Sequence, residues 1–332
     1  MEYESKNPTP EIAFLNEPKM SDHEVDKNRN ERRTELMSPL KNFLANHERF
    51  QGKKVSVAFS LSGVSSLIAF LETPEEKLVI KIPLRDDLPE GESKFLQEWE
   101  KVGVRVPHII EEGVIGKRPY TIMEYIDGET LSTKYSDKEL LERGAFTDMG
   151  KILRTMHLPE VEGFGHILDS KPEYSDFKSW LQNSMSKKRS YTKEHKLLFE
   201  NEHGSLDTAT KILLEYGETC KKSAYCHYDY GSYNIFASKP LTVFDDPMLN
   251  LPYIDLGRSI VIGPAGNGIP EAVNQFTEGY AYQSEPIDRK ILQASMLVNS
   301  VQKFPYWNKT KKQKRIKNVQ EYLANTKHFL ES

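Results

Sequence analysis

The first half of the chain contains short apolar runs, rich in β-branched and aromatic residues, separated by turn residues. Each run has the length and composition of a β-strand. They span Val55–Phe59, Ser66–Glu72, Lys77–Pro83, His108–Glu112 and Tyr120–Ile126. The turn residues 73–76 predict a hairpin between the second and third runs. Residues 91–102 place Phe95, Leu96 and Trp99 on one side of a predicted helix. This pattern predicts an antiparallel sheet interrupted by one helix.

Residues 1 to about 40 have a different texture. They carry nine acidic and six basic residues before Leu36 and show little periodicity. A segment with so few apolar side chains cannot bury enough surface to offset the entropy of ordering it. We therefore interpret residues 1–44 as a polar arm, flexible or loosely docked, outside the core. The small sheet-rich lobe is then expected at 45–126.

After Gly128 the pattern becomes mainly helical, with apolar residues three or four apart. The predicted helices cover Leu140–His157, Phe177–Lys188, Leu206–Cys220 and Asp288–Phe304. The only strand signals in this half are the pair Asn234–Ala237 and Leu241–Asp245. We therefore predict an α+β protein with two lobes, the second a larger helical lobe at 127–332.

Composition excludes several classes. The 332 residues carry 45 basic and 49 acidic side chains, a formal net charge of −4, whereas proteins that grip nucleic acid usually have a basic excess. No run of 18 apolar residues exists, so no membrane span is expected. The first residues lack the order of a secretory signal, and Cys220 and Cys226 are too few for a disulfide framework. We expect a monomeric cytoplasmic protein with no nucleic-acid or membrane partner.

The segment Cys226–Phe236, CHYDYGSYNIF, is the most informative for chemistry. His227 is followed by Asp229 two residues later and by Asn234 five residues beyond that. In the protein-kinase catalytic loop an Asp orients the acceptor hydroxyl and takes its proton, and an Asn five residues on holds magnesium. One short loop must reach both the acceptor oxygen and the metal-bound phosphates. A helix before the loop and a strand after it favour this interpretation over a capped turn.

A second carboxylate for the metal follows the apolar strand that begins at Leu241. Asp245 ends this strand directly, so we favour it as the ligand for a magnesium ion between the β- and γ-phosphates. Asp246 competes for the same role. The run Asp245-Asp246-Pro247 also fits a simple turn.

The order of these motifs resembles that of the aminoglycoside phosphotransferase family, whose fold is similar to that of the protein kinases. The catalytic loop is most similar to that of hygromycin B phosphotransferase, including Gly231-Ser232. Four further motifs are similar to the family's pattern, and the similarity spans roughly Val55 to Ile262. They are Tyr120–Leu131 at the hinge strand, Met149–Ile167 with its helix ending in His, Asp245 at the strand end, and Pro252–Gly257 with Asp255-Leu256.

The resemblance implies a nucleotide site in the small lobe, for ATP with Mg²⁺. Lys81 takes the place of the lysine on the α- and β-phosphates, and Glu92 that of the glutamate paired with it, with Glu98 as the fallback. Ser62, Gly63 and Ser65 belong to the loop that covers the nucleotide. The backbone around Glu124, Tyr125 and Ile126 takes the place of the adenine-binding hinge. In the catalytic loop the resemblance gives Asp229 the catalytic role, Asn234 and Asp245 the metal, and His227 a loop-bracing role.

One departure and several alternatives stay open. The family usually has glycine or another small residue between the catalytic His and Asp, where this chain has Tyr228. The acceptor implied by the resemblance is a hydroxyl of an aminoglycoside-type antibiotic. The large lobe offers acids for such a cation, but no motif assigns any of them to a site: Asp255, Glu271, Glu278 and Glu285. The alternatives are a housekeeping metabolite kinase and a non-catalytic nucleotide-binding pseudokinase.

A basic stretch near the end of the chain is the remaining charge feature. Residues 303–317 include seven basic side chains and no acid. A nucleic-acid contact would need such a run, but no recognised binding fold accompanies it. We interpret the stretch as a solvated helix face.

Overall fold

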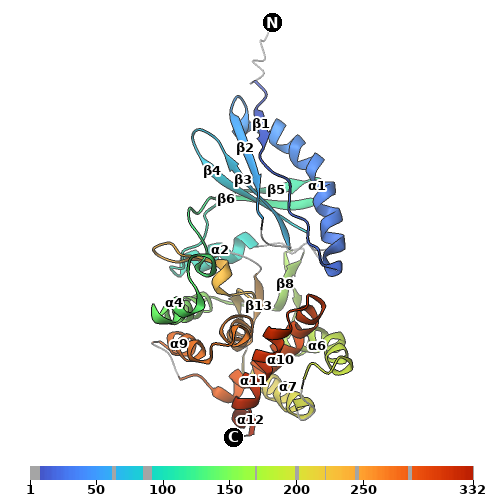
Figure 1. The fold of residues 1–332 in the computed structure, drawn as a ribbon, viewed down its shortest axis with the longest axis vertical. Coiled ribbons are helices and arrows are strands. Elements are labelled where there is room, and N and C mark those ends of the chain that lie inside the picture. Colours follow the sequence, from blue (N-terminus) through green and yellow to red (C-terminus); the bar gives the residue numbers. More distant parts are fainter. Residues whose placement is uncertain are drawn as a thin grey trace. The chain divides into compact units, whose positions relative to one another are not determined.

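The structure is a computed structural model, and it describes residues 8–61, 65–84, 92–168, 170–198, 202–220, 222–243, 247–282 and 286–331. The chain divides into two compact units (Figure 1). The first unit comprises residues 1–93 and 107–127, and the second comprises residues 94–106 and 128–332. The α+β class and the two-lobed, protein-kinase-like organisation predicted from the sequence are confirmed.

The first unit is a six-stranded sheet with one long helix against it (Figure 1). Its strands have the order β1-β2-β3-β4-β6-β5, with β1 parallel to β2 and the other neighbours antiparallel. Their bounds are β1 Glu11–Phe14, β2 Lys54–Phe59, β3 Ser66–Glu72, β4 Lys77–Pro83, β5 Ile109–Ile115 and β6 Arg118–Glu124. The hairpin β3–β4 has the bounds that the apolar runs predict, because β3 alternates buried and less buried positions, β4 does so as far as Ile80, and clear turn residues separate them.

The prediction of a polar arm at residues 1–44 is wrong for the described residues from Glu11 onward. Strand β1 extends the sheet, and helix α1 (Lys27–Asn46) packs on it through Leu36, Leu40 and Leu44. These leucines recur every four residues and form one apolar stripe. The stripe starts only at Leu36, after a long polar segment that dominates the composition of residues 1–44, which is why composition hid it.

The end of α1 is also fixed by polar contacts to the sheet. The Tyr120 hydroxyl donates to Glu111 Oε1 at 2.5 Å, and His47 Nε2 lies 2.8 Å from the same oxygen. Phe43 packs on the Tyr120 ring at 4.7 Å between ring centroids. Burial and the carboxylate of Glu111 raise the pKa of Tyr120. Helix α1 is thus part of the core of this unit.

Leu40 tests this packing. It has no exposed surface, so Leu40→Ala leaves a cavity between α1 and the sheet. We expect a loss of about 3 kcal/mol in the free energy of unfolding, measured by urea denaturation. Leu15→Ala is the control, because Leu15 is 66% exposed. Equal stability of the two variants would mean that α1 is a loosely docked arm after all.

The second unit consists mainly of helices around a small sheet. Its helices are α3 Leu131–Lys134, α4 Asp137–Glu142, α5 Ala145–Met156, α6 Phe177–Glu194, α7 Glu202–Thr219, α8 Pro252–Ile260, α9 Pro270–Tyr280, α10 Arg289–Lys309, α11 Gln313–Thr326 and α12 His328–Glu331. Helix α2 (Glu92–Lys101) spans the division between the units, and from residue 94 onward it packs with the second. The sequence analysis placed this helix in the small lobe, but Phe95 and Trp99 are buried against Tyr225 of the second unit.

Strands in the second unit are short. The predicted hairpin is present as β11 (Ile235–Phe236) and β12 (Thr242–Val243). A five-stranded sheet was missed by the sequence analysis, with the order β7-β10-β13-β8-β9. Its strands are β7 Glu160–Val161, β8 Phe164–Leu168, β9 Lys171–Tyr174, β10 Ser223–Cys226 and β13 Met248–Asn250. Runs of two to five residues are too short for periodicity to predict.

Helices α5 and α9 approach closely through two glycines. A Cβ on Gly150 would lie 2.1 Å from the Phe276 carbonyl oxygen, and a Cβ on Gly279 would lie 2.0 Å from the Thr147 carbonyl oxygen. Backbone atoms cannot rotate away as a side chain can, so the two helices would have to separate.

We therefore expect Gly150→Ala to lower the free energy of unfolding by about 1–3 kcal/mol, measured by urea denaturation. Gly204→Ala is the matched control, because Gly204 lies in α7 with no atom near its would-be Cβ. That variant should be neutral or stabilised by up to about 1 kcal/mol, since alanine favours helix more than glycine. A Gly150→Ala protein as stable as Gly204→Ala would contradict the close packing.

Candidate functional site

The predicted catalytic loop lies between β10 and β11, and its polar groups contact one another. Asn234 Nδ2 donates to the Asp229 carbonyl oxygen at 3.0 Å and lies 3.4 Å from Asp229 Oδ2. The Asp229 N–H donates to His227 Nδ1 at 3.3 Å. The structure therefore brings together the three residues that the sequence spacing singled out. Their roles stay predictions.

Asn234 has the chemistry of a magnesium ligand. Its side chain is buried, and its amide nitrogen faces Asp229. The amide oxygen is then the atom that it offers to a cation, and oxygen is the ligand type that Mg²⁺ prefers. The predicted partner Asp245 and its competitor Asp246 lie outside the described residues.

Tyr228 has a left-handed backbone, with φ of +65°. This is the position where the resembled family usually has glycine or another small residue, and glycine adopts such a φ without strain. Here the strain is opposed by fixed contacts of the tyrosine. Its carbonyl accepts from Arg258 Nε, its ring lies 3.8 Å from the Arg258 guanidinium, and its hydroxyl donates to Gln302 Oε1 at 2.6 Å. The departure from the family pattern thus preserves the backbone turn and adds a bulky, anchored ring.

Asp255, in the first turns of α8, binds the backbone of the catalytic loop. Its carboxylate is fully buried and accepts three hydrogen bonds. The donors are the His227 N–H at 2.7 Å, the Tyr228 N–H at 2.8 Å and His157 Nε2 at 3.0 Å. His157 is held in turn by the Tyr280 hydroxyl at 2.7 Å. The loop backbone is therefore fixed by a charge in the core.

The ionised form of Asp255 is favoured in the folded protein. Burial by itself would raise the pKa of its carboxyl group, but the hydrogen bond and charge of His157 and the His227 contacts lower the pKa below its ordinary value. Asp255 is consequently committed to the loop. It is not available to a cationic acceptor, for which the sequence analysis had named it.

The same core contains three groups of metal-ligand type. Ligand atoms of His157, Cys226 and Asp255 all lie within 4.8 Å of one another. His157 and Asp255 are already hydrogen-bonded, and burial raises the pKa of the Cys226 thiol, which favours its protonated form. This cluster therefore fits a structural brace better than a metal site.

Helix α2 contributes a support that sequence reasoning missed. The Trp99 indole stacks on the His227 imidazole, 5.8 Å between centroids and 4° between planes. Its Nε1–H donates to the Tyr225 carbonyl oxygen at 2.8 Å. Trp99 thus fixes both β10 and the first residue of the loop. Periodicity identified Trp99 only as a core residue of a helix.

A lysine also reaches the loop from α10. Lys303 Nζ lies 3.4 Å from Asp229 Oδ1, and the two side chains are 20% and 26% exposed. The prediction of a solvated helix face for residues 303–317 is therefore wrong at Lys303. Its sequence context could have indicated this, because Lys303 is the only charged residue between Lys290 and Lys309.

The predicted phosphate-binding residues are on the first unit. Lys81 is buried on β4, paired with Thr121 of β6. Alternation along β4 places it on the sheet face opposite Ile80 and Ile82, which belong to the core under α1. Ser65 accepts the Leu84 N–H through its carbonyl at 2.8 Å. The loop residues Ser62 and Gly63 lie outside the described residues.

The predicted partners of Lys81 are Glu92 and, as the fallback, Glu98, and the structure describes the side chain of Glu98 only. Glu92 begins helix α2, and its side chain is outside the described residues. Glu98 forms an ion pair with Lys101 of the same helix at 2.6 Å. That local pairing gives no support to Glu98 as the fallback.

The predicted hinge follows the end of β6. The Glu124 N–H donates to the His108 carbonyl at 2.9 Å, and its carboxylate accepts the His108 N–H at 3.1 Å. Tyr125 packs edge-on against Phe70, 5.8 Å between centroids. Ile126 is half-buried. The backbone of this segment is thus held in place where the adenine is expected.

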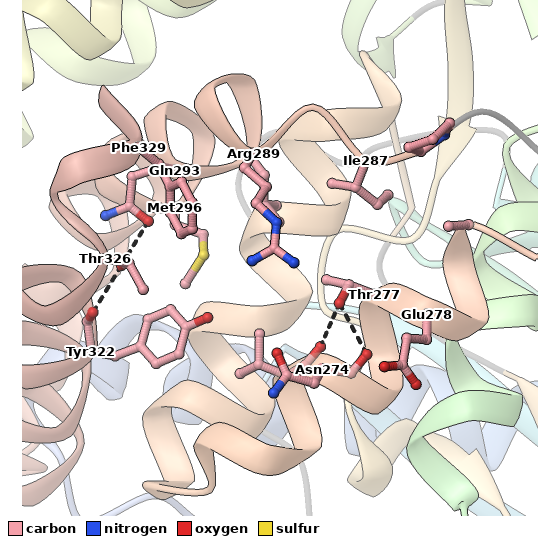
Figure 2. A pocket seen from close by; sticks show the side chains of 14 residues that line it. Asn274, Thr277, Glu278, Ile287, Arg289, Gln293, Met296, Tyr322, Thr326 and Phe329 are labelled. Atoms are coloured by element: carbon pink, nitrogen blue, oxygen red, sulfur yellow. Dashed lines mark hydrogen bonds between the residues drawn. The ribbon is translucent and has the colours of Figure 1, made fainter. Parts of the chain in front are cut away.

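A separate pocket lies between α9, the start of α10 and the C-terminal helices (Figure 2). Its volume is about 240 Å³. Polar side chains lining it include Glu278 and Arg289, and the Thr326 hydroxyl donates to Gln293 Oε1 at 2.9 Å. The lining includes no catalytic-loop residue. This pocket is therefore distinct from the predicted catalytic site.

Within the described part of the chain, none of the helices combines the length and the apolar character needed to cross a bilayer.

Comparisons with known proteins give a family and a fold. The model of the phosphotransferase enzyme family matches residues 57–287. No curated protein matches the sequence. The crystal structure of aminoglycoside phosphotransferase APH(4)-Ia is 13% identical, with a TM-score of 0.61 over 87% of this chain and 98% of that chain. A thermostable mutant of that enzyme, in ternary complex with AMP-PNP and hygromycin B, is 13% identical, with a TM-score of 0.60 over 84% and 96%. Ethanolamine kinase from Plasmodium vivax is 12% identical, with a TM-score of 0.50 over 81% and 80%.

Proposed function

This chain belongs to the phosphotransferase enzyme family, and from that premise we propose that it transfers the γ-phosphoryl group of ATP to a hydroxyl of a small molecule. The observation that supports this most directly is the contact of Asp229 with Asn234 and His227 in one loop. A carboxylate held beside an oxygen ligand for magnesium is the arrangement that phosphoryl transfer requires. A monomeric, cytoplasmic enzyme is part of the same proposal.

In the proposed reaction Asp229 accepts the proton of the acceptor hydroxyl. The acceptor oxygen forms a bond to the γ-phosphorus while the bond from that phosphorus to the β,γ-bridging oxygen breaks, and ADP leaves with the electron pair. When bound, Mg²⁺ neutralises charge on the phosphates. Asn234 would hold it together with Asp245. Lys81 is proposed to contact the α- and β-phosphates, with Glu92 as its partner.

Two classes of acceptor are supported by the solved structures. The complex with AMP-PNP and hygromycin B supports an aminoglycoside, and with it a role in antibiotic resistance. The ethanolamine kinase supports a metabolite alcohol. For an aminoglycoside the named acids give little support, because Asp255 is buried and engaged and Glu271 and Glu278 are exposed on α9. Glu285 lies outside the described residues. We therefore keep the acceptor at the level of a small-molecule alcohol here.

The test is a screen for ATP consumption with magnesium across aminoglycosides, other antibiotics and metabolite alcohols. We expect acceptor-dependent ADP release that stops when EDTA removes the metal. The alternative is a pseudokinase. Tight binding of AMP-PNP together with no phosphoryl transfer to any acceptor would favour that alternative and contradict the proposal.

A further inference from the structure

Basic side chains from three helices interact electrostatically beside the Asp229 carboxylate. We call Arg258 of α8, Lys303 of α10 and Arg315 of α11 the basic cluster. Lys303 contacts Asp229 directly at 3.4 Å. Arg258 lies on the neighbouring Tyr228, bonded to its carbonyl and stacked on its ring.

Arg315 is fixed by neutral oxygens rather than by an acid. It donates to the Ile262 carbonyl at 2.5 Å and to Asn267 Oδ1 at 2.6 Å. Among the residues that the structure describes, Asp229 is the only carboxylate that forms an ion pair with the basic cluster. Among the described residues, three positive charges therefore share one directly paired carboxylate, with Asp137 as a further electrostatic partner of Arg315, so this described cluster has an excess of positive charge.

The excess of positive charge affects the pKa of Lys303. Burial lowers the pKa of Lys303, the Asp229 carboxylate raises it, and the two arginines lower it again. Like charges held close together in a partly dry site repel one another unless an anion joins them. The arrangement is therefore complementary to a further negative charge.

The further anion could belong to the nucleotide or to the acceptor. The oxygen of Asp229 that Lys303 contacts helps to distinguish these two sources. Asn234, the proposed metal ligand, approaches Asp229 Oδ2, whereas Lys303 contacts Oδ1. We expect the nucleotide phosphates to follow the metal, so Lys303 lies at the other oxygen, on the side where the acceptor is expected to approach. Both side chains of the Asp229–Lys303 pair are partly exposed, so a substrate can reach them.

We propose that the acceptor alcohol carries a carboxylate or phosphate group, and that the basic cluster binds this group beside Asp229. The proposal rests on the proposed phosphotransferase function and specifies its substrate class. A polycationic aminoglycoside is disfavoured at such a site by repulsion. The γ-phosphate of ATP is the other possible anion, and the experiment below separates the two.

The experiment measures binding of matched alcohols to the ADP-saturated enzyme by calorimetry. The probes form two sets that differ in charge: glycerate, glycerol and serinol, and gluconate, glucose and glucosamine. We expect the anionic member of each set to bind at least tenfold more tightly than its neutral and cationic counterparts. Tighter binding of the cationic members, or no preference for charge, would overturn the proposal.

Variants that remove one positive charge each test whether the basic cluster causes the preference for anionic alcohols. Lys303→Gln and Arg315→Gln should abolish the preference for the anion, while the dissociation constant of AMP-PNP changes less than about threefold. Lys309→Gln on α10 and Lys314→Gln on α11 remove the same charge at exposed positions and should keep the preference. If the first two variants weaken AMP-PNP instead, the basic cluster serves the nucleotide and the proposal is wrong.

The substrate-class proposal and the proposed function can fail separately. An enzyme that prefers anionic alcohols but never transfers phosphoryl from ATP would contradict only the function. An enzyme that phosphorylates cationic or neutral alcohols best would contradict only the inference about the acceptor.

Discussion

Asp229→Asn should lower kcat by about 10²–10⁴-fold, the range for loss of a general base. The substitution keeps the size of the side chain and one oxygen for Asn234 or Lys303, so the loop should stay folded. What it removes is the ability to accept the proton of the acceptor hydroxyl. The measurement is acceptor-dependent ADP release at saturating ATP, using the best acceptor from the screen.

Two further measurements show whether a loss of turnover in Asp229→Asn comes from the lost base. The dissociation constant of AMP-PNP for Asp229→Asn should stay near the wild-type value, because the proposed nucleotide contacts are made by other residues. Asp148→Asn is the control, since Asp148 is 61% exposed on α5 and pairs with Lys151 rather than with a predicted catalytic residue. Near-normal turnover of Asp229→Asn would mean that another group accepts the proton and that the catalytic assignment is wrong.

The catalytic loop was the part of the site most accessible to sequence reasoning. His227, Asp229 and Asn234 belong to one short segment, so their spacing alone constrains how their side chains can meet. The strands β3 and β4 were equally accessible, because alternation and turn residues are local signals. Motif order across the chain added the family, which the match of residues 57–287 confirms.

Contacts between distant segments could not be predicted in the same way. Lys303 reaches Asp229 from a helix that follows it by 74 residues, and Trp99 reaches His227 from before it. No local spacing relates such pairs, because the packing of whole helices decides them. The apolar stripe of α1 was missed for a different reason, since Leu36 and Leu40 follow a long polar segment that dominated the composition.

Tyr228 shows where a family pattern and physical chemistry give complementary information. The pattern marked it as a departure from a small residue, and the left-handed φ gives the physical reason for the family's preference. The contacts with Arg258 and Gln302 explain how a tyrosine is accommodated. Those same contacts anchor part of the basic cluster, so the departure and the inferred acceptor class belong to one structural feature.

Asp255→Asn should lower the free energy of unfolding by about 3–5 kcal/mol at pH 7, the range for breaking a buried charge pair. Asp255 accepts two backbone N–H groups and His157 through its two oxygens. Asparagine offers one oxygen and an N–H₂ group in their place, so a buried donor faces another donor. Turnover should also fall, because the loop that presents Asp229 loses its anchor. Urea denaturation and the kinetic assay measure the two effects.

The pH dependence of stability separates the charge of Asp255 from its shape. The pKa of Asp255 is lower in the folded protein than in the unfolded chain, where it is about 3.9. Its ionisation therefore stabilises the fold fully above that value, and this contribution is lost as the pH falls below about 4. The difference in stability between wild type and Asp255→Asn should be constant from pH 8 to 6 and shrink below about pH 4. Asp207→Asn, at a site 66% exposed, should show no such difference, and a pH-independent loss in Asp255→Asn would contradict the charged brace.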